Sequence, residues 1–178
     1  MMSAPFAYCP VCGSNNFTLK GPRLLVCGQC DYHYHDNPVA AVAGFLPDDK
    51  GRILLIRRAK EPSKGKLALP GGFVDIGETA EAALERELKE ELNLDLISTE
   101  YLTSHPNEYP YRGRIVAVLD LFFVGTVRSW AGAEALAEVD SFVHLAPNEI
   151  KGEDLAFLSM RAALDRYKAS LQEVRRAP

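Results

Sequence analysis

Three glutamates, Glu87, Glu90 and Glu91, lie within five positions of each other in a segment with helical periodicity. At 100° per residue they fall within about 100° of arc, so they share one helix face. On a solvated surface their repulsion would be only roughly a few tenths of a kcal/mol, which is no sign of a site. In a cleft, carboxylates about 5 Å apart would repel by roughly 3 kcal/mol and would need cations or protons. Oxygen ligands in this arrangement suit Mg²⁺ or Mn²⁺, hard ions that also bind phosphate.

Four cysteines form a second set of candidate metal ligands, Cys9 and Cys12 in one C-x-x-C pair and Cys27 and Cys30 in another. Four thiolates can surround one Zn²⁺ at about 2.3 Å, and such a closed site is structural because no position is left for substrate. A segment of this length cannot bury enough apolar surface to fold unaided. Two disulfides or a redox C-x-x-C pair are the alternatives, and a reducing compartment favours zinc.

The glutamates need a helix that turns one face toward the protein. Thr79 is a suitable N-cap, and the residues that follow predict a helix through about Leu92. Leu84 and Leu88 form an apolar seam with Leu92 beside the acidic face, so the seam fixes which side of the helix packs on the protein.

Further elements should form the body of the domain. Residues 39–47 and 52–59 are predicted to be two strands of a hairpin joined by the tight turn DDKG. More strands are predicted near 97–103, at 114–127 and at 141–147, followed by a last helix from about 153 to 173. An apolar stripe along that helix predicts core packing, and a homodimer contact is the alternative.

The segment from Gly72 to Leu94 closely resembles the Nudix box, G-x5-E-x7-R-E-U-x-E-E-x-G-U, where U is aliphatic. The matching positions are Gly72, Glu78, Arg86, Glu87, Leu88, Glu90, Glu91 and Leu94. Asn93 stands where the family has glycine. Because that residue ends the helix in a left-handed conformation, which asparagine tolerates best after glycine, we expect no loss of chemistry.

The resemblance implies a set of ligands for a catalytic Mg²⁺ or Mn²⁺. Glu87, Glu90 and Glu91 would bind the divalent ions, and the carbonyl of Gly72 would add a ligand. Glu138 lies in AEVDSF, which is similar to a later E-A-R-W-F stretch of the family, and is a further candidate ligand. The alternative for Glu138 is an exposed glutamate at the start of a strand.

The resemblance also implies catalytic roles. Glu90 or Glu91 would take the proton from the attacking water, Glu78 would support the metal ligands from the loop, and Arg86 would orient a glutamate through a salt bridge. The implied reaction is hydrolysis, by metal-activated water, of the diphosphate bond in a nucleoside diphosphate joined to another group. Such transfers depend mainly on charge neutralisation and positioning, which a metal on a carboxylate face supplies.

The fold class that follows is α+β, a Nudix α/β/α sandwich at residues 37–178 behind a zinc ribbon at residues 1–36. The turn DNP at 36–38 is a plausible junction between the two. A zinc ribbon before such a domain is similar to the NADH pyrophosphatase branch, which also carries S-Q-P-W-P-F-P-x-S. This chain has SHPNEYPYR at the corresponding distance, so it matches only half of that motif.

The same segment, residues 104–112, is predicted to be a loop that supplies the substrate contacts. Ser104 and Tyr109 match the motif, and Tyr109 and Tyr111 would stack on a base while Asn107 would hydrogen-bond it. A proline-rich loop whose tyrosines only pack is the alternative. NADH-like and ADP-ribose-like substrates are favoured over nucleoside triphosphates. A non-catalytic nucleotide sensor with the ribbon as docking module is a further alternative, but such sensors commonly lose box glutamates, and all are present here.

Composition restricts the remaining function classes. The 178 residues carry a formal charge of -4 and are 47% hydrophobic, which fits one domain with a small extra module. The scattered basic residues disfavour a nucleic-acid partner. No apolar run reaches the roughly 20 residues that span a bilayer, and the start of the chain lacks the pattern of a secretory signal. We therefore expect a cytoplasmic location and a small-molecule nucleotide as partner.

Overall fold

The computed structural model describes residues 6–21 and 23–176, which fall into two compact units that divide after Pro38. The predicted boundary between residues 36 and 37 lies just before this division. Residues 1–5, 22 and 177–178 of the predicted modules lie outside the described residues.

The first unit is a small antiparallel sheet. Its strands β1 (Phe17–Lys20), β2 (Leu24–Cys27) and β3 (His33–His35) pair in the order β1-β2-β3. In the described part of this unit, the buried hydrophobic side chains are Leu25 and two of the cysteines, Cys9 and Cys27. A core of this size needs a cross-link such as a metal ion to be stable.

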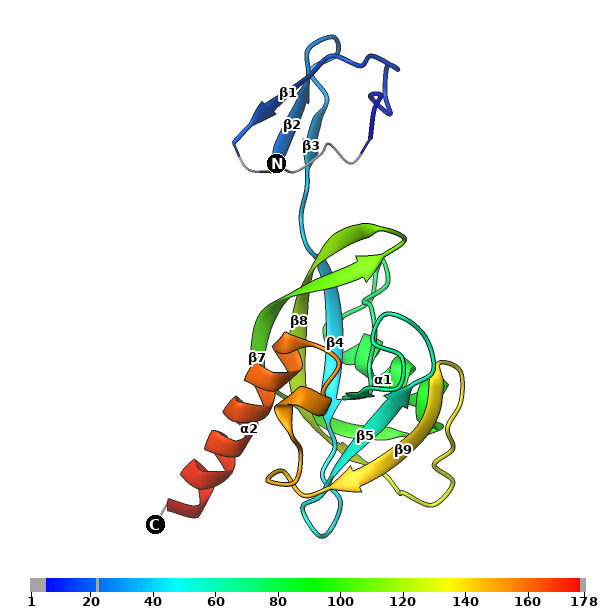
Figure 1. The fold of residues 1–178 in the computed structure, drawn as a ribbon, viewed down its shortest axis with the longest axis vertical. Helices are drawn as coiled ribbons and strands as arrows, with labels where there is room; N and C mark the ends of the chain where they lie inside the picture. Colours follow the sequence, from blue (N-terminus) through cyan, green and yellow to red (C-terminus); the bar gives the residue numbers. More distant parts are fainter. Residues whose placement is uncertain (1–5, 22, 177–178) are drawn as a thin grey trace. The chain divides into compact units, whose positions relative to one another are not determined.

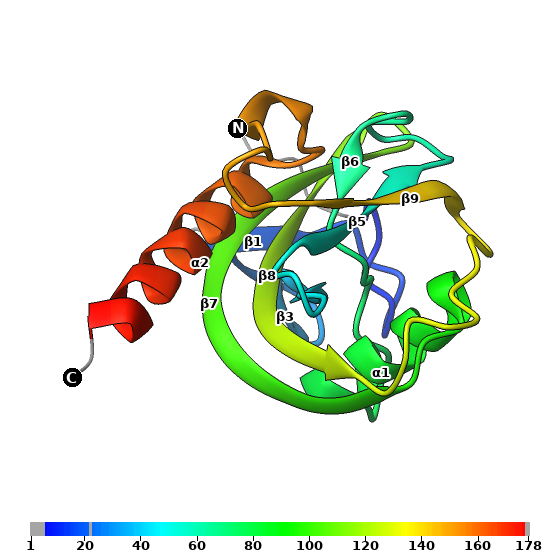
Figure 2. The ribbon, with the colours of Figure 1, turned by 90° about the horizontal axis from the view of Figure 1, so that it is seen from below.

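The second unit contains a mixed sheet in the order β4-β8-β7, with β4 parallel and β7 antiparallel to β8. Its strands are β4 (Val39–Phe45), β8 (Arg114–Val127) and β7 (Leu96–Tyr111). β7 and β8 are long and curve together, as Figure 2 shows, and α2 (Leu158–Arg176) contacts β7 (Figures 1 and 2).

A second, antiparallel sheet completes this unit in the order β6-β5-β9. Its strands are β6 (Leu67–Ala68), β5 (Ile53–Arg58) and β9 (Val139–Leu145). With α1 (Ala80–Leu92) and α2, the sheets make the mixed α and β architecture that was predicted. None of the helices in the described ranges is long and apolar enough to cross a lipid bilayer.

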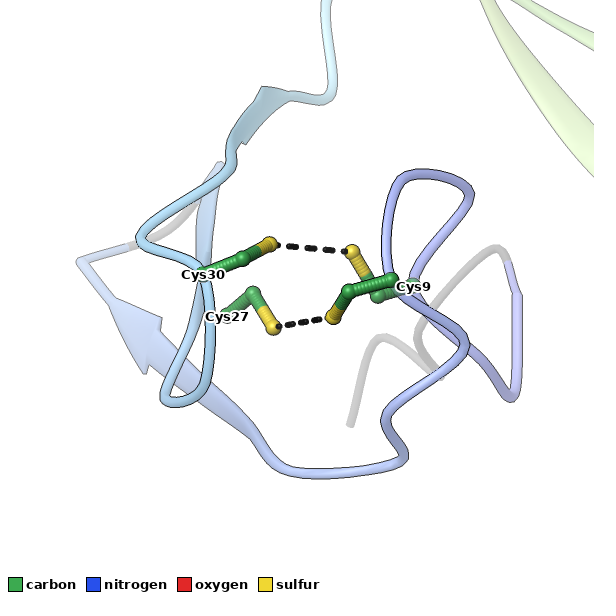
Figure 3. Close-up of side chains that lie close together, drawn as sticks. Cys9, Cys27 and Cys30 are labelled. Carbon is green, nitrogen blue, oxygen red and sulfur yellow. Dashed lines mark hydrogen bonds between the residues drawn. The ribbon is translucent and has the colours of Figure 1, made fainter.

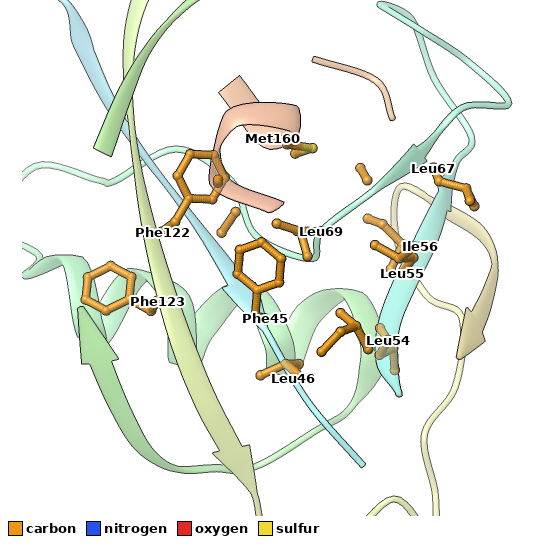
Figure 4. Packing of buried hydrophobic residues seen from close by; sticks show 14 of the residues in the cluster. Phe45, Leu46, Leu54, Leu55, Ile56, Leu67, Leu69, Phe122, Phe123 and Met160 are labelled. Atoms are coloured by element: carbon orange, nitrogen blue, oxygen red, sulfur yellow. The ribbon is translucent and has the colours of Figure 1, made fainter. Parts of the chain in front are cut away.

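The core brings together side chains from the sheets and both helices. Figure 4 labels those of the sheets and of α2. Phe45 of β4, Leu54 of β5, Leu88 of α1 and Phe122 of β8 are all fully buried. Tyr167 of α2 stacks on Phe45 with ring centroids 4.6 Å apart. The predicted packing of the last helix on the core is therefore confirmed.

Both predicted ends of α1 are confirmed. The Thr79 hydroxyl accepts a hydrogen bond from the Ala82 backbone N–H at 3.2 Å, as an N-cap does. Asn93 ends the helix with φ 53° and ψ 33°, and its N–H reaches the carbonyls of Leu88 and Lys89. Asparagine therefore occupies the left-handed position that the family fills with glycine.

The predicted hairpin between residues 39–47 and 52–59 forms only next to its turn, where Pro47 bridges to Ile53 and the Leu54 N–H donates to the Leu46 carbonyl at 3.2 Å. The chain does turn at DDKG, where Asp48 accepts hydrogen bonds from the N–H groups of Lys50 and Arg52. Farther from the turn, β4 pairs with β8, and β5 pairs with β6 and β9. Both strands are apolar on both faces, so their pattern predicts burial without specifying a partner.

The predicted loop at residues 104–112 is wrong, because β7 continues through it to Tyr111. Pro106 and Pro110 argued against a strand, since proline has no N–H to donate to a ladder. β7 is an edge strand of its sheet, where the missing N–H can face away from the partner strand.

The last helix begins later than predicted, at Leu158. A short 3₁₀ turn, Gly152–Asp154, is followed by Leu155 in an extended conformation. The buried Leu155 bridges to Leu67, and the next residue, Ala156, donates its N–H to the Leu67 carbonyl at 2.8 Å. This extension beside β6 prevents an earlier helix start.

Candidate active site

A cavity of about 430 Å³ lies in the second unit, lined by α1, the β4-β8-β7 sheet and the start of α2. Glu87, Glu90 and Glu91 of α1 all line it. The apolar seam explains why: Leu84, Leu88 and Leu92 are fully buried and fix the rotation of the helix. The structure therefore brings the three predicted metal ligands to one wall of one cavity.

Arg86 connects this wall to the loop before α1. Its guanidinium donates to both carboxylate oxygens of Glu78, at 2.7 and 3.0 Å, and to the Phe73 carbonyl at 3.0 Å. It also donates to Glu87 at 2.9 Å and to Glu90 at 3.3 Å. The bond from Arg86 lowers the pKa of Glu78. Arg86 thus orients two metal-ligand candidates, and Glu78 in turn orients Arg86.

Glu91 is the most buried of the three glutamates, with only 8% of its surface exposed. Burial raises its pKa to about 8, and the negative charge of Glu87 adds to this rise, although the Gly71 N–H donates to Glu91 at 3.0 Å. Burial also raises the pKa of Glu87, despite the salt bridge with Arg86. Without a cation these carboxyl groups hold protons more tightly than usual, which fits a site whose counter-ion is a metal.

Two glycines allow close approaches in the turn before α1, Gly72 to the helix and Gly71 to β4. A Cβ on Gly72 would lie 2.3 Å from the Glu87 carboxylate oxygen Oε1. Gly71 has φ of +138°, and a Cβ there would lie 2.2 Å from the Val42 carbonyl. The Gly72 carbonyl accepts a hydrogen bond from the Val42 N–H at 2.8 Å, which leaves it a second lone pair.

The other predicted residues divide into two groups. Glu138, Asn107 and Tyr109 line the cavity, and Glu138 forms an ion pair with Lys60 at 2.8 Å. Ser104 and Tyr111 do not line this cavity, and the ring of Tyr111 is packed against the Arg112 guanidinium.

Sequence reasoning missed a buried polar pair on the sheet side of the cavity. Asp120 of β8 lines the cavity with only 8% of its surface exposed, and the hydroxyl of Ser159 in α2 donates to it at 2.5 Å. Asn107 also hydrogen-bonds the Asp120 carboxylate. A single acidic residue in the otherwise apolar run VAVLDLFFV was the signal that could have identified it.

The four cysteines of the first unit meet in one cluster, with all sulfur atoms within 4.8 Å of one another (Figure 3). The Sγ atoms of Cys9 and Cys30 lie 3.7 Å apart, and those of Cys12 and Cys27 lie 3.6 Å apart. Four thiolates at about 2.3 Å from a tetrahedral Zn²⁺ would lie about 3.8 Å apart. Backbone N–H groups of Cys30 and Gln29 lower the pKa of Cys27 to about 6, whereas burial and the neighbouring cysteines raise the pKa of Cys30. The cluster therefore fits a structural zinc ion.

Fold and site together define a class of protein, a mixed α and β domain in which an acidic helix lines a cavity. The family model for the NUDIX domain matches residues 37–167. The chain belongs to this family, which confirms the predicted family and, with the cysteine cluster, the predicted fold class.

Curated relatives of the chain carry two different names. The chain is 42% identical over 90 residues to an ADP-ribose pyrophosphatase of Methanocaldococcus jannaschii, a match that covers 49% of this chain and 52% of the relative. It is 29% identical over 128 residues to the NAD-capped RNA hydrolase NudC of Vibrio atlanticus, covering 71% of this chain and 46% of the relative. The chain thus spans about half the length of these relatives.

Solved structures show the same fold. A NUDIX hydrolase from Nitrosomonas europaea superposes with a TM-score of 0.68 at 24% identity, over 91% of this chain and 90% of that chain. The NUDIX domain of Shewanella oneidensis NrtR, complexed with ADP ribose, superposes with a TM-score of 0.61 at 20% identity, over 76% and 89% of the two chains.

Proposed function

We propose that this chain is a divalent-metal-dependent hydrolase that cleaves the diphosphate bond of a nucleoside diphosphate derivative, with ADP-ribose and NADH as favoured substrates. The observation that carries this proposal is the wall of three glutamates, Glu87, Glu90 and Glu91, beside a cavity of about 430 Å³, with Arg86 bonded to the first two. The relatives named as an ADP-ribose pyrophosphatase and as NAD-capped RNA hydrolases support the substrate class.

Different residues of this chain would bind the metal ion, bind the diphosphate and accept the proton. Bound Mg²⁺ or Mn²⁺ would supply charge neutralisation for the diphosphate and activation of water. The α1 glutamates would hold the ion, the Gly72 carbonyl would add an oxygen ligand, and Glu138 would approach from the turn just before β9. Arg58 and Lys60, which also line the cavity, would attract the diphosphate. The proton of the attacking water would pass to Glu90 or Glu91.

A substrate panel with Mg²⁺ tests the proposal. It consists of ADP-ribose, NADH, NAD⁺, FAD, nucleoside triphosphates and NAD-capped RNA, with release of nucleoside monophosphate as the readout. We expect cleavage of ADP-ribose or NADH, and loss of that cleavage in Glu91→Gln. Glu85→Gln is the matched control, because Glu85 is exposed on the same helix and does not line the cavity. An unchanged rate in Glu91→Gln would reject the catalytic assignment.

The two alternatives give different results in the same panel. Faster cleavage of triphosphates than of ADP-ribose would identify a nucleoside triphosphate pyrophosphatase. Binding of ADP-ribose without turnover of any compound would identify a nucleotide-sensing domain.

A further inference from the structure

We propose that Asp120, positioned by Ser159 and Asn107, selects nucleotides whose base carries an exocyclic amino group, such as adenine or guanine. The proposal rests on the proposed function in one respect, namely that a nucleotide occupies the cavity. It adds a specificity-determining residue on the sheet side of the cavity, away from the glutamates of α1.

Strand register places Asp120 on the cavity face of the sheet. It is flanked by Ala41 on β4 and by His105 on β7. Asn107 pairs with Val118, and both line the cavity, so side chains of the same face alternate along the two strands. Because Ala41 ends at a methyl group, there is room for a ligand beside the Asp120 carboxylate.

The carboxylate is held in place from two sides. The Ser159 hydroxyl, only 2% exposed, donates to Oδ2 at 2.5 Å, and Asn107 provides a second hydrogen bond. A carboxylate has about four lone-pair sites, so acceptor capacity remains toward the cavity that Asp120 lines. A ligand N–H group is the natural partner for this remaining capacity.

Anchoring of α2 to the sheet does not account for a carboxylate at this position. An amide or a second hydroxyl would accept from Ser159 without the desolvation that a buried charge requires. That desolvation raises the pKa of Asp120 in the free protein. A donor from the ligand would offset the desolvation, which explains why an acid is placed where an amide would suffice for folding.

Aromatic side chains lie beside this acceptor. The ring of Tyr109 lies 5.4 Å from that of Phe73 and 5.8 Å from that of Phe157, and all three residues line the cavity. Such rings bind the flat face of a base, which leaves the edge of the base to polar groups. We therefore place the base among these rings with its amino edge toward Asp120.

Hypoxanthine is the matched probe for this chemistry. It differs from adenine by an oxygen in place of the 6-amino group, and from guanine by loss of the 2-amino group. Compared with adenine, the 6-oxygen of hypoxanthine would be repelled by the Asp120 carboxylate. Compared with guanine, the missing 2-amino group would leave that carboxylate without a donor. Hypoxanthine should therefore bind more weakly than either base.

The experiment is calorimetric titration of the full chain with AMP, GMP and IMP, without a need for turnover. We expect AMP or GMP to bind at least about tenfold more tightly than IMP. Tight binding of AMP would indicate recognition of adenine, and tight binding of GMP would indicate recognition of guanine. In Asp120→Asn, whose amide can donate as well as accept, we expect this ratio to fall toward one. Ser159→Ala should lower the ratio too, because the carboxylate loses its anchor.

Equal affinities for the three monophosphates in the wild-type chain, or no binding of any of them, would overturn the proposal. So would an equal loss of all three affinities in Asp120→Asn, because that is the result of an anchoring role alone. The comparison of AMP, GMP and IMP affinities in the wild-type chain tests the proposal even if Asp120→Asn does not fold. Failure to hydrolyse any diphosphate compound of the substrate panel would reject the proposed function without changing these ratios.

Discussion

The buried carboxyl group of Glu91 makes the stability of the metal-free protein depend on pH. Its pKa of about 8 lies above the ordinary value of 4.5, so between these values the folded chain keeps a proton that the unfolded chain releases. The free energy of unfolding should therefore fall as pH rises through this range, by up to about 1.4 kcal/mol per pH unit. Stability from this group is complete at pH 4.5 and lost above pH 8.

Replacing Glu91 by Gln should remove that dependence. The amide cannot ionise, and its oxygen can still accept from the Gly71 N–H. In urea titrations with a chelator present, Glu91→Gln should match the wild type near pH 5 and exceed it at pH 8. Glu85→Gln should keep the wild-type slope, since Glu85 is exposed. Parallel pH profiles for wild type and Glu91→Gln would show that the group titrates normally.

Gly72 tests how closely α1 must approach the turn before it. In Gly72→Ala the new methyl would lie 2.3 Å from Glu87 Oε1, so the carboxylate must rotate away from its present position. We expect a loss of Mg²⁺ affinity and of hydrolysis, with a change in unfolding free energy of less than about 1 kcal/mol because a side-chain end can move.

Gly152→Ala is the control for that substitution. A Cβ there meets only the Arg161 side chain, at an ordinary 3.6 Å. Retention of full Mg²⁺ affinity by Gly72→Ala would mean that the position of Glu87 in this structure is not the metal-binding one.

At the scale of elements, the C-terminus of α1 sets the end of the metal-binding face. Asn93 adopts φ 53°, a conformation that costs about 1 kcal/mol for alanine and nothing for glycine. Asn93→Ala should therefore lower the unfolding free energy by about 1 kcal/mol, whereas Asn93→Gly should leave it within about 0.5 kcal/mol of the wild type. Urea titration of the two variants checks this. Equal losses in both would assign the role of Asn93 to its side chain.

The sequence predicted α1 well because capping residues mark both of its ends. Thr79 and Asn93 are capping residues with a mechanism, and the leucine seam of α1 fixes the rotation that turns the glutamates toward the cavity. Pairing partners were not predictable in the same way. β4 and β5 are each apolar on both faces, and nothing local distinguishes a hairpin from two strands in different sheets.

Tertiary context decided the remaining elements. Pro106 and Pro110 predict a loop unless the strand is known to lie at a sheet edge, and edge position is a property of the whole sheet. Leu155 is extended because Leu67 is beside it, although the two are distant in sequence. Asp120 gains its role only when Asn107 and Ser159 are brought to it from β7 and α2.

At the scale of the whole molecule, the two units depend on different sources of stability. The second unit has a continuous core that includes both helices and five of its strands. In the described part of the first unit, two of the three buried hydrophobic residues are themselves cysteines of the cluster, Cys9 and Cys27. In such a unit the free energy of zinc binding supplies the free energy of folding.

Replacing Cys27 by Ser should therefore unfold the first unit alone. Three ligands and a hydroxyl bind Zn²⁺ far more weakly, and the small sheet has no apolar core to compensate. In hydrogen exchange, amides of β2 such as Leu25 should lose protection, whereas core amides such as Leu54 and Leu88 should keep theirs. Thr18→Ala, on the exposed face of β1, is the control and should leave both units protected. Loss of protection at Leu54 and Leu88 in Cys27→Ser would mean that the second unit requires the folded first unit, against the separate cores seen here.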